Sequence, residues 1–134
     1  EAALHSYFAV GDVREVRVHG LEGVRYIDKT DAMKEKRQEG ALQISAETDR
    51  VYLDTTAAVR VEEGGRGGIE VAKEGSHTTV VWNPWVAKAR AMADFGDDEW
   101  TGMLCVETCR VMRDALRVDP GATVGMIARV RALG

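Results

Sequence analysis

Several features that mark common protein classes are scarce in this 134-residue chain. Two prolines and two cysteines are too few for a proline-rich linker or a disulfide scaffold. No apolar run approaches the roughly 20 residues that a membrane-spanning helix needs, and no signal-peptide pattern is visible. We therefore predict that the protein has no membrane partner, and the cysteine usage favours a cytoplasmic location.

An excess of positive charge is also missing. Eighteen Lys and Arg residues are interspersed with 22 Asp and Glu residues, which gives a formal net charge of −4. Proteins that bind nucleic acids usually concentrate basic residues on one face or along one helix, and no such concentration occurs here. We therefore predict no nucleic-acid partner.

The chain lacks the motifs of metal sites and covalent catalytic sites. It contains no HExxH motif, no close pair of histidines and no GxSxG motif. Cys105 and Cys109 are four positions apart, which in a strand separates their Cα atoms by roughly 13 Å, beyond the ~7 Å limit for a disulfide. We predict two free, buried thiols and no metal site.

The glycine-rich segment Gly64–Gly68 raises the question of a phosphate-binding loop. Such loops open a helix after a strand and end in Lys followed by Ser or Thr. This segment instead joins two strand-like runs and no Lys-Ser or Lys-Thr pair follows it. The better interpretation is a β-hairpin turn.

The chain does contain many short runs rich in β-branched and aromatic residues, separated by glycine-containing turns. The expected strands are 4–10, 13–18, 51–53, 59–62, 69–72, 78–82, 103–111 and 123–130. This spacing is typical of an antiparallel β-sandwich or barrel and not of a parallel α/β sheet. Helix is scarce, with two candidates: the charged segment 31–39, and 84–93 with a proline in its first turn.

One acid lies inside an apolar, strand-like run, Met103-Leu-Cys-Val-Glu107-Thr-Cys109. Period-two alternation places Glu107 on the same face as Cys105 and Cys109. Burial disfavours the charged carboxylate and raises its pKa, so this Glu would accept a proton near neutral pH. The alternative is a structural Glu that pairs with a basic side chain or lies on an edge strand, and the segment alone does not separate the two.

His5 and Asp49 are the other polar residues in strand-like surroundings. His5 lies between Leu4 and Phe8 and shares its face with Tyr7, where a lone His is more often a packed core or interface residue. Asp49 begins the run Asp-Arg-Val-Tyr-Leu-Asp, where a turn residue is the more common outcome. A Glu with a raised pKa and a His together suit proton transfer, because one group accepts a proton while the other donates one.

Five motifs follow one another in an order that resembles a known family over essentially the whole chain. They are Leu4-His-Ser-Tyr-Phe8, Asp49-Arg-Val-Tyr-Leu-Asp54, Val80-Val-Trp-Asn-Pro84, Met92-Ala-Asp-Phe-Gly96 and Met103-Leu-Cys-Val-Glu107. With these motifs the chain resembles the C-terminal half of a hexose-6-phosphate mutarotase, also called glucose-6-phosphate 1-epimerase, in the aldose 1-epimerase superfamily. The chain opens at Glu1, without Met and inside strand-like sequence, so we expect it to start within a longer protein.

The resemblance implies an all-β fold, the galactose-mutarotase-like antiparallel β-sandwich. Residues 1–134 would form the C-terminal portion of one such domain, an incomplete part of the supersandwich. Family members are roughly twice this length, and the arginines that bind the 6-phosphate, together with a further active-site histidine, would lie upstream of this chain. The full-length protein is expected to be a monomer with a sugar phosphate as its partner.

The resemblance also implies an isomerase that interconverts the α and β anomers of a hexose 6-phosphate by opening the ring, without a cofactor. Glu107 resembles the general base that removes the proton of the anomeric hydroxyl, and His5 resembles the general acid that protonates the ring oxygen. Asp49 resembles the residue that hydrogen-bonds the sugar hydroxyls. Trp82 and Asn83 are candidates for lining the cleft, although core packing explains Trp82 equally well.

Two other outcomes stay open on the sequence. A sandwich of this superfamily can keep its sugar cleft for recognition without catalysis, as a carbohydrate-binding module. The chain by itself can also be an inactive fragment, because part of a sandwich exposes strand edges and apolar surface.

Overall fold

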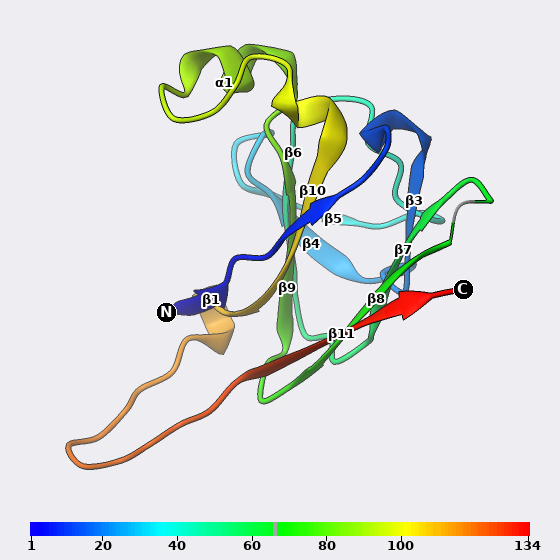
Figure 1. The fold of residues 1–134 in the computed structure, drawn as a ribbon. Coiled ribbons are helices and arrows are strands. Elements are labelled where there is room, and N and C mark those ends of the chain that lie inside the picture. The colour runs from blue at the N-terminus through cyan, green and yellow to red at the C-terminus, as the bar shows by residue number, and fades with distance from the viewer. Residues whose placement is uncertain (66) are drawn as a thin grey trace.

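The computed structural model describes residues 1–65 and 67–134, and most of its regular elements are short antiparallel strands (Figure 1). The strands in these ranges are β1 (Ala2–Leu4), β2 (Tyr7–Ala9), β3 (Val16–His19), β4 (Arg25–Asp28), β5 (Lys34–Arg37), β6 (Thr48–Tyr52), β7 (Val59–Glu63), β8 (Gly68–Glu74), β9 (Thr78–Asn83), β10 (Met103–Arg110) and β11 (Ile127–Leu133). The helical elements are α1 (Trp85–Ala91) and the 3₁₀ turns η1 (Val13–Glu15), η2 (Glu99–Gly102) and η3 (Met112–Asp114).

The strands form two antiparallel sheets. One sheet has seven strands: six follow the order β1-β10-β9-β6-β4-β5, and the seventh, β2, also pairs with β10. The other sheet has four strands in the order β11-β8-β7-β3. Side chains from both sheets meet in one apolar core, including Val18 of β3, Val61 of β7, Tyr52 of β6 and Leu104 of β10. The antiparallel β-sandwich, which the strand spacing predicted alongside a barrel and which the family resemblance implied, is therefore confirmed.

Alternation along the strands decides which face enters this core. In β3 the burial follows the sequence strictly, with Val16 and Val18 buried and Arg17 exposed between them. The expected strand 13–18 nevertheless begins later than predicted, because residues 13–15 form the turn η1, which Asp12 caps by accepting a hydrogen bond from the Arg14 amide.

The segment 31–39 is not a helix, and this prediction was wrong. Ala32 and Met33 adopt positive φ angles in a turn, and Lys34–Arg37 then forms β5 against β4. The charges in this segment pair across the turn and the strands: Lys36 Nζ lies 2.8 Å from carboxylate oxygens of both Asp28 and Asp31. A lysine-rich strand at the edge of a sheet also discourages pairing with other chains.

Two other predicted elements are confirmed. Helix α1 occupies the segment that begins at Pro84, and β7 and β8 form a hairpin in which Val61 lies opposite Ile69. Residue 66, within the expected glycine-rich turn, lies outside the described residues.

The segment between η3 and β11 runs out from the body of the molecule before it returns as an edge strand on β8 (orange and red in Figure 1). Within the described ranges, no helix is both long enough and apolar enough to cross a membrane.

Candidate active site

Strand β10, which pairs with β9 on one side and with β1 and β2 on the other, carries the acid that the sequence singled out. Leu104 and Val106 point into the core between the sheets, so Cys105 and Glu107 point to the opposite face. Glu107 is only 5% exposed although it faces away from the second sheet. The alternation predicted from the sequence therefore holds, and it places a carboxylate in a largely apolar setting.

His5 reaches Glu107 because the strand that precedes it breaks at this point. Both β1 and β2 pair with β10, with Leu4 opposite Thr108 and Tyr7 opposite Cys105. His5 and Ser6 lie between these two short strands, so the expected strand 4–10 is divided in two. Continuing the register places His5 across from Glu107, and its Nε2 atom lies 3.4 Å from Glu107 Oε1.

The surroundings of Glu107 make it a proton acceptor near neutral pH. The pKa of this carboxyl is raised from an ordinary value of 4.5 to about 7, and burial is the largest cause. The nearby carboxylate of Asp49 contributes to this rise, and the ammonium of Lys29 partly offsets it. A carboxyl that is partly ionised at pH 7 is suited to general acid–base chemistry, because it can both take and return a proton.

Asp49 lies on the same face of the sheet as Glu107, two strands away. It is in β6 opposite Trp82 of β9, and it is only 9% exposed, so it is a strand residue and not the turn residue that the sequence also allowed. Its Oδ2 atom lies 3.3 Å from Lys29 Nζ. Lys29 follows β4 directly, where its amide donates to the Asp49 carbonyl at 2.9 Å.

The three predicted site residues line one cavity of about 400 Å³. Small-molecule sites commonly have volumes of roughly 300–1,000 Å³, so this cavity has a suitable size for a monosaccharide derivative. Trp82 lies at its wall and also packs on Met103 and Cys105, so both interpretations of this residue hold.

Asn83 does not line the cavity, and that prediction was wrong. It follows Trp82 in β9 and therefore points to the opposite face, where it is fully buried. Its Nδ2 atom donates to the carbonyls of Trp100 and Met103 at 2.9 Å each, and its Oδ1 atom accepts from the Trp85 amide at 2.9 Å. Its role is to hold the start of α1 and the start of β10 together.

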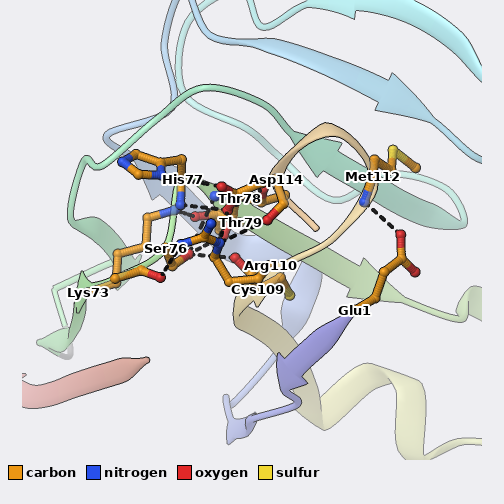
Figure 2. A network of polar contacts seen from close by, with 11 residues as sticks. Glu1, Lys73, Ser76, His77, Thr78, Thr79, Cys109, Arg110, Met112 and Asp114 are labelled. Carbon is orange, nitrogen blue, oxygen red and sulfur yellow. Dashed lines mark hydrogen bonds and ion pairs between the residues drawn. The ribbon is translucent and has the colours of Figure 1, made fainter. Parts of the chain in front are cut away.

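A network of polar contacts anchors the other end of β10, next to the cavity (Figure 2). Asp114 of η3 accepts hydrogen bonds from the His77 amide at 2.9 Å and from Thr78 Oγ1 at 3.2 Å, and it forms an ion pair with Arg110 Nε at 3.0 Å. Ser76 Oγ donates to the Cys109 carbonyl at 2.6 Å. These contacts fix the end of β10 to the β8–β9 turn, and so they hold the strand that carries Glu107.

Two neighbours of the site were not found from the sequence. Lys29 enters the cavity because β4 pairs with β6, a pairing that no local pattern indicated. Tyr7 was noted only as sharing a face with His5, and its ring in fact stacks on the imidazole. The described part of the chain contains no group of three or more His, Cys, Asp or Glu side chains arranged to hold a metal ion.

Cys105 and Cys109 are free thiols with no exposed surface, as predicted. Burial raises the pKa of both thiols, that of Cys109 to about 12. Because the thiolate is the reactive form, we expect neither residue to be alkylated by iodoacetamide at pH 7.5 in the native protein, and both to react after unfolding in denaturant. Tandem mass spectrometry of the peptide that carries them measures this, and rapid native labelling of either thiol would contradict it.

Comparison with known proteins agrees with this architecture. The sequence matches the family described as aldose 1-epimerase over residues 1–129. It is 41% identical over 121 residues to a Cenchrus ciliaris protein named "Putative glucose-6-phosphate 1-epimerase", and 39% identical over 109 residues to a Salmonella typhimurium protein of the same name. These matches cover 89% and 80% of this chain, but only 36% and 37% of the two relatives. The chain thus spans little more than a third of the length of these curated relatives.

A solved structure is similar as well. It is described as the crystal structure of "a putative mutarotase (YeaD)" from Salmonella typhimurium, with a TM-score of 0.74 and 40% sequence identity. The similarity covers 79% of this chain and 36% of that one.

Proposed function

The chain belongs to the aldose 1-epimerase family, and we propose that it carries the acid–base pair of an isomerase that interconverts the α and β anomers of a hexose 6-phosphate. The observation that carries the proposal is the position of His5 Nε2, 3.4 Å from Glu107 Oε1, at a cavity that Asp49 also lines. Relatives are named for glucose 6-phosphate, so this sugar is the first substrate to test.

Ring opening requires one proton to leave the sugar and one to arrive. Glu107, with a pKa of about 7, accepts the proton of the anomeric hydroxyl. His5 donates a proton to the ring oxygen, the bond from C1 to that oxygen breaks, and C1 becomes an aldehyde. Glu107 is then protonated and His5 is neutral.

Closure on the other face reverses the same transfers. The bond from C1 to C2 rotates, and the hydroxyl that was formed from the ring oxygen attacks the opposite face of the aldehyde. That hydroxyl returns its proton to His5, and Glu107 protonates the new anomeric oxygen. Both groups end in their starting states, so the cycle consumes no cofactor and no other reactant.

Asp49 and Lys29 supply the polar contacts that hold the sugar. The carboxylate of Asp49 accepts hydrogen bonds from sugar hydroxyls, and charge-assisted bonds of this kind are roughly twice as strong as neutral ones. Within the described part of the chain, Lys29 is the one Lys or Arg side chain that lines the cavity, and it is 46% exposed. It is therefore the group available in this chain for an anionic substituent of the ligand.

The proposal is tested by anomer exchange. Glucose 6-phosphate is mixed with the longest native polypeptide that contains residues 1–134, and magnetisation exchange between the α and β anomeric protons is measured by NMR. Exchange well above the buffer rate is expected. Binding of the sugar without faster exchange would instead favour the alternative of a non-catalytic carbohydrate-binding sandwich, and neither binding nor exchange by residues 1–134 alone would identify that piece as an inactive fragment.

Replacing Asp49 by Asn is expected to raise the KM for the sugar roughly 10- to 150-fold, because a charged hydrogen bond contributes roughly 1.5–3 kcal/mol. The same change removes a negative charge that raises the pKa of Glu107, so the acidic limb of the kcat profile moves to lower pH. Kinetics between pH 5 and 8.5 measure both effects. Asp54→Asn, at an exposed acid that does not line the cavity, is the matched control, and an unchanged KM for Asp49→Asn would contradict the role.

A further inference from the structure

The two members of the acid–base pair are held in very different ways. Glu107 lies in the middle of the longest of the described strands, is 5% exposed and pairs with Val80 of β9. His5 lies in the gap between β1 and β2 and its side chain is 47% exposed. An exposed side chain on a residue without strand pairing can populate several rotamers, so something other than the backbone must orient the imidazole.

Aromatic rings supply this orientation. The His5 and Tyr7 rings are stacked, with centroids 4.8 Å apart and planes inclined by 15°. Trp82 meets both rings edge-on, with centroids 5.9 Å from His5 and 6.1 Å from Tyr7. The β2 register with Tyr7 opposite Cys105, two positions from Glu107, places the Tyr7 ring beside the imidazole on the same face of the sheet.

We propose that Tyr7 is the positioning residue of the acid–base pair, and that its ring holds the His5 imidazole by stacking so that Nε2 points at the cavity and at Glu107. This inference rests on the proposed function. Its physical basis is that a stacked face confines the imidazole to one plane, so fewer ring orientations compete with the productive one. The electron-rich face of a tyrosine ring also favours a positively charged neighbour, and the imidazole must be charged to act as the acid.

The position of Tyr7 separates this role from a packing role. Tyr7 is 56% exposed, and substitution of so exposed a side chain usually changes stability little. A purely structural residue with this exposure would therefore leave turnover unchanged when truncated. A positioning residue would lower kcat, because it acts on the orientation of the acid, and would leave KM nearly unchanged.

The test compares Tyr7→Leu with Tyr7→Phe in the longest native polypeptide that contains residues 1–134. Tyr7→Leu is expected to lower kcat for anomer exchange about tenfold with KM within twofold, while Tyr7→Phe, which keeps the ring, retains at least half of the wild-type kcat. Phe95→Leu is the matched control. The Phe95 ring lies edge-on to Trp82, with ring centroids 6.5 Å apart, but it makes no ring contact with His5. Its kcat is expected to stay within twofold of the wild type.

NMR gives a readout independent of turnover. Stacking shifts the ring protons of His5 upfield through the ring current of Tyr7, and the His5 signals are identified by their absence in His5→Gln. Tyr7→Leu is expected to remove the shift and Tyr7→Phe to retain it, while the signals of His19 and His77 stay in place in both.

The kcat values of these variants either support or overturn the role of Tyr7. Wild-type kcat in Tyr7→Leu would overturn the inference, and so would equal losses in Tyr7→Leu and Tyr7→Phe, which would assign the effect to the hydroxyl. If Glu107→Gln keeps wild-type turnover, the proposed function itself fails. If Glu107→Gln is inactive and Tyr7→Leu is fully active, the function stands and the inference alone fails.

Discussion

Glu107→Gln is expected to lower the rate of anomer interconversion roughly 10²- to 10⁴-fold, the usual contribution of one general acid or base. The amide has nearly the same shape as the carboxyl but accepts no proton from the anomeric hydroxyl. Because the two side chains are nearly equal in shape, the substitution removes the chemistry with little change in packing even at this almost fully buried position. Polarimetry of freshly dissolved α-glucose 6-phosphate measures the rate.

The matched control for this loss is Glu62→Gln. Glu62 is a half-exposed acid on β7, in the four-stranded sheet, and it does not line the cavity. Its rate should equal that of the wild type. Wild-type turnover in Glu107→Gln would show that another group is the base.

Glu107 is also expected to make stability depend on pH, with a sign that follows from its raised pKa. The folded protein holds this proton up to about pH 7, whereas the unfolded chain releases it near pH 4.5. The folded state is therefore favoured in full below pH 4.5, and the advantage disappears as the pH rises through 7. One pKa unit corresponds to about 1.4 kcal/mol, so the free energy of unfolding should lose up to about 3 kcal/mol from this group.

Urea unfolding of the wild type and of Glu107→Gln between pH 4 and 8.5 isolates this effect. The amide resembles the protonated carboxyl and does not titrate, so the two proteins should be similarly stable at pH 4. Above pH 7 the variant should be the more stable one. Parallel stability curves across the whole range would mean that Glu107 titrates near its ordinary value.

The site was predictable where one strand contained the whole signal. The alternation in Met103-Leu-Cys-Val-Glu107 is local, and both the buried position of Glu107 and the raised pKa followed from it. Asp49 was ambiguous, because its short run is compatible with a strand although a turn residue is the more common outcome there. Its pairing with Trp82, which lies 33 positions later, settles the matter.

The errors came from segments whose local pattern was weak. The charged run 31–39 is only weakly periodic, and the cross-strand ion pair of its Lys36 with Asp28 forms only once β4 is in place. Lys29 was missed for the same reason, because its contact with Asp49 needs the β4–β6 register.

The sequence by itself determined the class of fold, the face of β10 on which Glu107 lies, and the free, buried state of the two thiols, because alternation and apolar content act within one strand. Only the tertiary structure decided that His5, about a hundred residues upstream, meets Glu107, and that Tyr7 and Lys29 join them. The physical reason is that strand pairing is non-local. Which strands pair depends on how the whole sheet buries its apolar face, and a short stretch of sequence does not contain that information.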